Sequence, residues 1–223
     1  HAEYVCVDQE SSIASMPGGV TYDEVADLAY SGGTAWDFLV ERADLQQEES
    51  IAIVGAAGGV GRSAVQLAKY LEADVTAVCR AEDADFVRRI GADRVVDYRR
   101  EDVADHDSRY DVILDTSGTL EFGSCRAALT DDGRYLTLLI SLRLIVEMLW
   151  TALVGGQRAM GGVATESTET LETLAELVEN GSLQPTVDSR YPLERIREAH
   201  DRLENGHPDR KSTRLNSSHR LRS

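Results

Sequence analysis

Short apolar segments alternate with helical patterns along most of the chain. Five segments have the length and the apolar, often β-branched character of buried strands: Ile51–Val54, Val75–Cys79, Arg94–Asp97, Asp111–Asp115 and Arg134–Leu138. Between them, apolar residues recur at helical spacing from Val60 to Leu71, through Phe86, Val87 and Ile90, and through Phe122, Cys125 and Leu129. Strands that alternate with helices pair in parallel, so the pattern predicts an α/β fold with a doubly wound parallel sheet.

The turn after the first strand carries glycines at every third position, Gly55, Gly58 and Gly61. Such a turn can bend sharply, and it lets a phosphate group approach the backbone closely. The N–H groups and the positive dipole end of the following helix then face the anion. A glycine-rich turn alone is weak evidence, but here a strand precedes it, a helix follows it and a second strand begins about twenty residues later. The segment therefore predicts a dinucleotide-binding site at the carboxyl ends of the strands.

The chain is strongly acidic, with 39 acidic and 23 basic residues and a formal net charge of −16; only two of the basic residues, Lys69 and Lys211, are lysines. Excess carboxylates keep a protein hydrated in concentrated salt, where the repulsion between them is screened. We therefore expect a halophilic protein in a salt-rich cytoplasm; an ordinary acidic protein is the alternative. The acidity also argues against nucleic acid as a partner.

The three cysteines, Cys6, Cys79 and Cys125, lie far apart and form no CxxC pair. This spacing predicts neither a structural zinc site nor a disulfide framework. Cys79 ends an expected strand and Cys125 lies on the apolar face of an expected helix, so we expect both to be small core residues.

The longest apolar run extends over Tyr135–Val154. A membrane span is one interpretation, but Arg143 and Glu147 interrupt the run, and charges at bilayer depth are costly. We favour a strand followed by a largely buried helix that covers a substrate cleft or a subunit interface. No membrane partner is predicted.

The two ends of the sequence differ from the rest. The chain does not begin with Met, so we expect the true N-terminus to lie further upstream. From Arg210 on, five basic residues and no acidic residue occur among Ser, Thr and Asn. A basic arm for nucleic acid or membrane is one interpretation; we favour a tail, 210–223, that is disordered or not native.

A series of further segments occurs in a characteristic order: Ala2–Val5, Leu28–Ala35, Ala56–Gly61, Gly91–Asp93, Val96–Tyr98, Tyr110–Asp115, Arg190–Leu193 and Ala199–His200. Together, over residues 2–208, they resemble the medium-chain dehydrogenase/reductase superfamily, in its zinc-independent, quinone-oxidoreductase-like branch. The resemblance implies a Rossmann cofactor domain at 32–181. It also implies remnants of a GroES-like catalytic domain at 1–31 and a segment returning to that domain at 182–209.

Two departures from the family pattern affect the interpretation. The family has a long substrate domain before Ala2–Val5 and a short Gly-Lys-x-Val strand after the His200 helix, and this sequence has neither. We therefore expect a truncated chain. The second departure is local: Leu138-Leu139-Ile140 stands where the family usually has Gly near the nicotinamide.

The end of the second strand favours one nicotinamide cofactor over the other. Sites for NAD place Asp or Glu there, but this chain has Arg80, whose guanidinium can pair with the 2′-phosphate of NADPH. Tyr98 matches a family position that contacts the same phosphate, whereas Glu82 and Asp83 would oppose it. We predict NADPH rather than NADH; Arg80 as ordinary surface charge is the alternative.

The complete predicted cofactor set comprises Thr34, which would open the helix beside the nicotinamide, together with Ala57, Gly58, Gly59, Val60, Gly61, Arg80, Tyr98 and Thr116. No catalytic acid or base and no metal ligand is assigned, since the histidines form no local constellation.

The resemblance implies hydride transfer from NADPH to a quinone, an enone or a similar carbonyl, without metal. One alternative is a zinc-dependent alcohol dehydrogenase whose ligands lie outside this sequence. Another is a nucleotide-binding module without turnover, and we expect the 223-residue chain itself to be inactive. The remaining expectations are a cytoplasmic location and a homodimer.

Overall fold

The computed structural model describes residues 6–8, 11–101, 103, 109–165, 167–186 and 189–205. The chain divides into two compact units, His1–Thr186 and Val187–Ser223. The segment Ala2–Val5 and the tail 210–223 lie outside the described residues, so the predictions for them stay predictions.

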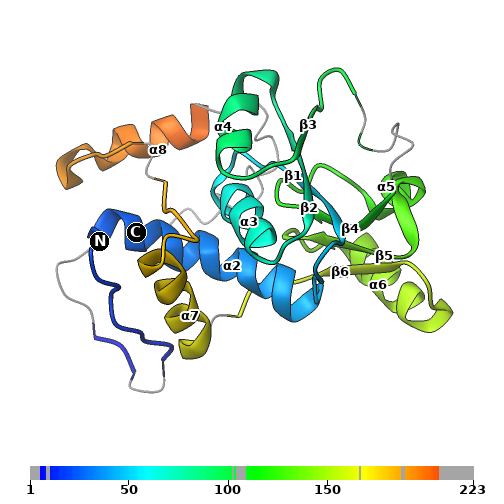
Figure 1. Cartoon of the computed structure of the whole chain (residues 1–223), viewed down its shortest axis with the longest axis horizontal. Helices are drawn as coiled ribbons and strands as arrows, with labels where there is room; N and C mark the ends of the chain where they lie inside the picture. The colour runs from blue at the N-terminus through cyan, green and yellow to red at the C-terminus, as the bar shows by residue number, and fades with distance from the viewer. Residues whose placement is uncertain are drawn as a thin grey trace, which may run out of the picture. The chain divides into compact units, whose positions relative to one another are not determined.

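The first unit is built on a six-stranded parallel sheet (Figure 1). Its strands, in chain order, are β1 Ser50–Val54, β2 Asp74–Cys79, β3 Arg94–Asp97, β4 Tyr110–Asp115, β5 Leu129–Thr137 and β6 Arg158–Gly161. Their order across the sheet is β3-β2-β1-β4-β5-β6. The first half of the sheet extends outward from β1 to β3. The chain then crosses back, and the second half begins with β4, which pairs with the other side of β1. This confirms the predicted doubly wound sheet of a Rossmann fold.

The fourth crossover differs from the prediction at Leu129. The expected helix is short: α5 covers Phe122–Cys125 and one tighter turn follows over Arg126–Ala128. Leu129 already belongs to β5, where it pairs with Tyr110, so its assignment to the helix was wrong. The next paired residue is Arg134, opposite Val112, and the residues between bulge out of the ladder. The regular part of β5 therefore begins where the sequence predicts it.

Two apolar clusters lie on opposite faces of the sheet, because successive strand residues point to opposite sides. On one face, Ile51 and Ile53 pack with α3 (Gly59–Tyr70), α4 (Ala84–Arg89) and α7 (Thr168–Glu179). On the other face, Ala52 and Val54 belong to the cluster that includes residues of α5 and of α6 (Leu142–Val154). Figure 1 shows α3 and α4 on one side of the strands and α5 and α6 on the other.

A helical segment precedes the sheet in the chain. It runs through α1 (Tyr22–Asp27), Leu28–Gly32, α2 (Gly33–Trp36) and Asp37–Arg42, and the second and fourth stretches have wider, π-helical turns. At its end the Arg42 guanidinium pairs with Asp37 at 2.6 Å and donates to the Gly161 carbonyl at 3.2 Å. The segment is thereby fastened to the last strand of the sheet.

Helix α6 differs from the expected buried helix. Of its residues, only Leu144 and Thr151 are buried. Its exposed apolar side chains are Leu142, Ile145, Val146, Leu149, Trp150, Leu153 and Val154. The prediction of a largely buried helix was wrong for this chain, and a role at a cleft or a subunit interface stays a prediction. Within the described part of the chain, no helix has the length and apolar character needed to cross a bilayer.

In the second unit, a single tight turn at Leu193–Arg195 leads into α8, Ile196–Asn205. The Arg195 guanidinium pairs with Glu198 in the first turn of this helix. His200 is exposed.

Candidate cofactor-binding site

The turn between β1 and α3 forms the centre of the candidate site. Gly55 leaves the strand with a φ of +77°, a conformation that L side chains rarely adopt. The Gly58 N–H donates to the Gly55 carbonyl at 2.9 Å, and Gly58 is the residue that precedes the first helical turn. The N–H groups of that first turn, in Gly59, Val60 and Gly61, have no carbonyl partner within the helix. They supply donors for an anion at the carboxyl end of β1.

Gly61 fixes the distance between the helix and the strand. A Cβ atom at this position would lie 2.1 Å from the Gly55 carbonyl oxygen and 2.8 Å from the Cα of Ala56. Any side chain there would therefore force α3 away from the turn. At Gly58 a Cβ would meet only the Gly55 oxygen, at 3.2 Å, so a small side chain could fit but would narrow the approach of a ligand.

The turn after β4 is locked against the turn after β1. Thr116 Oγ1 donates a hydrogen bond to the Val54 carbonyl at 2.8 Å. A Cβ atom on Gly55 would lie 2.7 Å from this Thr116 Oγ1 atom. Asp115 is fully buried, and its carboxylate accepts hydrogen bonds from the backbone N–H of Ser117 (3.0 Å), Gly118 (2.8 Å) and Leu120 (2.8 Å). Hydrogen bonds to a charged acceptor are strong, so this second turn is held rigidly.

Arg80 and Tyr98 lie together at the carboxyl ends of β2 and β3. The Tyr98 N–H points to the Cys79 carbonyl at 3.4 Å, which places Tyr98 beside the residue before Arg80. Arg80 Nε lies 3.1 Å from an Asp83 oxygen, and its Nη1 lies 2.8 Å from a Glu82 oxygen. Burial acts to lower the pKa of Arg80, but these carboxylates outweigh it and raise the pKa above its ordinary value. The two acids that the sequence suggests as opponents of a phosphate are thus direct partners of the guanidinium.

Thr34 comes from the helical segment that precedes the sheet. It is buried in α2, and its hydroxyl donates to the Tyr30 carbonyl at 2.8 Å. Ser31, which is not among the predicted cofactor residues, borders the glycine turn: a Cβ atom on Gly59 would lie 3.0 Å from its hydroxyl oxygen. No local pattern marks Ser31, because its position depends on the packing of α2 and its preceding turn against α3.

The described cysteines are free thiols. Cys79 and Cys125 are buried, as predicted, and no described cysteine forms a disulfide. Burial, with the charges of Asp83 and Asp97, raises the pKa of the Cys79 thiol to about 11, so it stays protonated at neutral pH. No group of three or more His, Cys, Asp or Glu residues within the described part of the chain is arranged to hold a metal ion.

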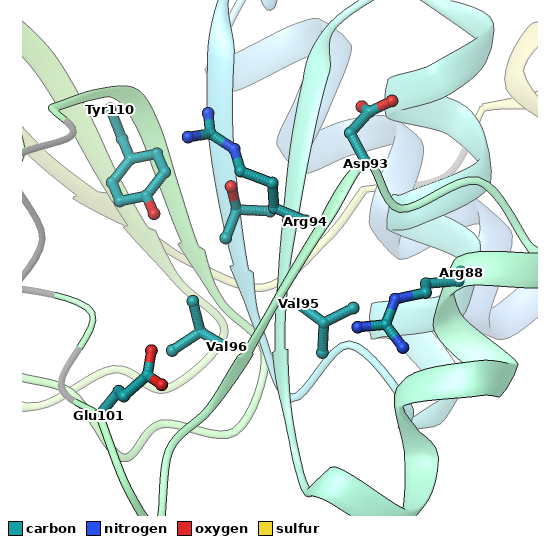
Figure 2. A pocket seen from close by; sticks show the side chains of 8 residues that line it. Arg88, Asp93, Arg94, Val95, Val96, Glu101 and Tyr110 are labelled. Atoms are coloured by element: carbon teal, nitrogen blue, oxygen red, sulfur yellow. The ribbon is translucent and has the colours of Figure 1, made fainter.

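A cavity of about 340 Å³ lies elsewhere, on the outer part of the sheet. It is lined by Thr76, Arg88, Asp93, Arg94, Val95, Val96, Glu101 and Tyr110, and Figure 2 shows the charged side chains around the apolar residues of β3. None of the predicted cofactor residues belongs to this lining. The candidate cofactor site is therefore a surface at the strand ends and not this cavity.

Comparison with known proteins identifies the family of the chain. A sequence model for the domain described as zinc-binding dehydrogenase matches residues 90–209, which is more than half of the chain. The chain belongs to this family. The assignment confirms the resemblance to the medium-chain dehydrogenase/reductase superfamily and its quinone-oxidoreductase-like members.

Individual relatives show the same family membership. The chain is 30% identical to the bovine mitochondrial NAD(P)H oxidoreductase RTN4IP1, over 92% of this chain and 58% of the relative. It is 29% identical to the chloroplast envelope quinone oxidoreductase homolog of Arabidopsis thaliana, over 92% of this chain and 65% of the relative. The chain thus spans about three fifths of the length of these curated relatives.

Solved structures give the same result for the fold. The quinone oxidoreductase from Coxiella burnetii superposes with a TM-score of 0.72 and 26% identity, covering 82% of this chain and 57% of that one. A thermostable alcohol dehydrogenase from Pyrobaculum aerophilum, solved with cobalt and zinc, superposes with a TM-score of 0.69 and 30% identity, covering 86% and 56%.

Proposed function

We propose that the chain is the cofactor-binding part of an NADPH-dependent oxidoreductase that reduces a quinone, an enone or a similar carbonyl without metal. The observation that carries this proposal is the glycine turn at the start of α3, with Arg80 and Tyr98 at the neighbouring strand ends. The printed names of the relatives, an NAD(P)H oxidoreductase and a quinone oxidoreductase homolog, support the same reaction class.

The residues of this chain would bind and orient the cofactor. The N–H groups of the first turn of α3 would hold the pyrophosphate, and Gly61 would keep the helix close enough for them to reach it. Arg80 and Tyr98 would meet the 2′-phosphate, while Thr116 would border the turn at Gly55. When bound, NADPH supplies the hydride, and the protein's part is to hold the reactive carbon against the acceptor and to exclude water. Because the chain covers only part of its relatives' length, turnover is proposed for the longer protein, and binding for this chain.

The location of the protein is part of the proposal. The relatives named above carry mitochondrial and chloroplast names. For this protein the proposal is the cytoplasmic location predicted from the sequence, and fractionation of the source cells tests it.

Zinc-dependent alcohol reduction is the second candidate, favoured by the family description and by the metal-bound alcohol dehydrogenase among the structural neighbours. Elemental analysis of the longer protein after dialysis separates the two. About one zinc per chain, lost together with activity on chelation, would favour the second candidate.

Calorimetric titration with NADPH tests the binding site. Gly58→Asp places bulk and negative charge where the pyrophosphate would lie, and we expect it to abolish binding. Ser182→Asp is the matched control, because it introduces the same charge away from the glycine turn. Ser182 lines a cavity together with Tyr70, the last residue of α3. Unchanged affinity in Gly58→Asp would rule out the glycine turn as the site.

A further inference from the structure

The loop after β5 carries an unusual exposed apolar pair. Leu139 is 48% exposed and Ile140 is 53% exposed, just before α6 begins. The backbone of this loop is tied down on both sides: the Leu138 N–H points to the Asp115 carbonyl at 3.4 Å, and the Leu139 N–H donates to Thr137 Oγ1 at 3.3 Å. The position of the Leu139 backbone is thus set by the ends of β4 and β5.

The Leu139 side chain lies directly on the turn after β4. Gly118 in that turn has a φ of +67°, and a Cβ atom on it would lie 2.1 Å from Leu139 Cδ1 and 2.6 Å from Leu139 Cγ. The Leu139 side chain can therefore pack here only because Gly118 has no side chain. The buried Asp115 carboxylate accepts a hydrogen bond from the Gly118 N–H at 2.8 Å, so the turn is held by a charge-assisted bond, whereas the half-exposed Leu139 side chain has no such bond.

The place of this contact matters for the proposed cofactor site. In a doubly wound sheet the two halves of a dinucleotide lie across the point where the strand order reverses, here between β1 and β4. Arg80 and Tyr98 assign the adenosine half to the β2 and β3 side. The nicotinamide half must then pass over the carboxyl ends of β4 and β5, where Leu139 bridges the two turns.

We infer that Leu139 is a positioning residue that closes the nicotinamide half-site and has to rotate off Gly118 before the whole dinucleotide can bind. The inference rests on the proposed function. The half-exposed side chain loses only part of its contacts when it rotates, so the closed state lowers the affinity for the dinucleotide only modestly and does not prevent binding. A closed state that must open reduces the affinity for the ligand that needs the open state, in proportion to the open fraction. It leaves the affinity for a ligand that occupies only the adenosine half unchanged.

Calorimetric titrations of the 223-residue chain with NADPH and with adenosine 2′,5′-bisphosphate, which lacks the nicotinamide half, separate the two halves of the site. Leu139→Ala should tighten NADPH binding about three- to tenfold, equivalent to ~0.7–1.4 kcal/mol. Leu139→Phe, which is bulkier, should weaken it. Neither variant should change the affinity for the bisphosphate. Leu153→Ala is the matched control, because it removes the same side chain from an 85% exposed position on α6.

The outcomes are distinguishable. If the wild-type chain binds neither ligand, the proposed function fails and this inference fails with it. If the wild type binds both ligands but Leu139→Ala leaves NADPH affinity unchanged or lowers it, only the role of Leu139 is overturned. Equal changes for both ligands would also overturn it, since they would indicate a structural effect on the whole site.

Discussion

Arg80 provides the sharpest test of cofactor choice, because the structure shows what competes for its charge. The side chain is 22% exposed, and its ion pairs with Glu82 and Asp83 use Nη1 and Nε. Neither pair involves Nη2, whose N–H groups are left for an incoming 2′-phosphate. A charge-assisted hydrogen bond contributes about 1.5–3 kcal/mol net. The two carboxylates repel the phosphate, so we expect the lower half of that range, or about ten- to fortyfold tighter binding of NADPH than of NADH.

Two substitutions bracket this expectation. Arg80→Asp should weaken NADPH strongly and leave NADH unchanged or slightly tighter. Glu82→Gln removes the more exposed of the two competing charges, at 61% exposure, and should tighten NADPH about two- to fivefold, in line with the small free energy of an exposed ion pair.

The assay is calorimetric titration with both cofactors at one fixed ionic strength, since salt weakens the phosphate contact selectively. Arg88→Asp is the matched control, because Arg88 is a 56% exposed arginine on the nearby α4 and should not alter the ratio of the two affinities. Equal affinity of the wild type for NADH and NADPH would refute the assignment, and Arg80 would then be ordinary surface charge.

The remaining predictions concern stability and turnover. The melting temperature should rise from low to molar KCl, because salt screens the repulsion among the excess carboxylates that give the chain its net charge of −16. A flat or falling curve would count against salt adaptation. The chain should bind NADPH yet show almost no quinone or enone reduction in a spectrophotometric assay, and robust turnover would contradict the expected truncation. Burial acts to raise the pKa of Asp111, but hydrogen bonds from Ser50 and Thr130 outweigh it and lower the pKa below its ordinary value. The stabilisation is therefore complete above the unfolded-state pKa and is lost as the pH falls through the native one. Asp111→Asn should lower the free energy of unfolding by about 1 kcal/mol at pH 7, and the difference from wild type should vanish in acid during urea titrations.

What the sequence predicts well is local. The strand, glycine turn and helix from Ile51 to Leu71 can be predicted because their hydrophobic spacing and turn residues lie next to one another in the chain. The last strand, Arg158–Gly161, has no such pattern, since it is short and its place is fixed by pairing with β5. Leu129 carries a helical spacing that its pairing with Tyr110 overrides.

The candidate site divides in the same way. The sequence marks Gly58, Gly61 and Arg80 by type and position. It cannot show that Glu82 and Asp83 already hold the guanidinium, nor that Leu139 lies on Gly118, because these contacts depend on side-chain placement between different segments. The exposure of α6 was equally hidden, because the count of apolar residues does not reveal how many neighbours cover them.

The central position of β1 has a consequence for the synthesis of this protein. Its first neighbour, β2, follows soon in the chain, but its second neighbour, β4, comes much later: Ser50 and Asp111, which hydrogen-bond across that pair, are separated by 61 residues. Until β4 leaves the ribosome, one side of an apolar strand has unpaired N–H and C=O groups. Such an edge is a template for aggregation, and pairings between distant segments form slowly. Nascent chains that end before Tyr110 should therefore accumulate as aggregates.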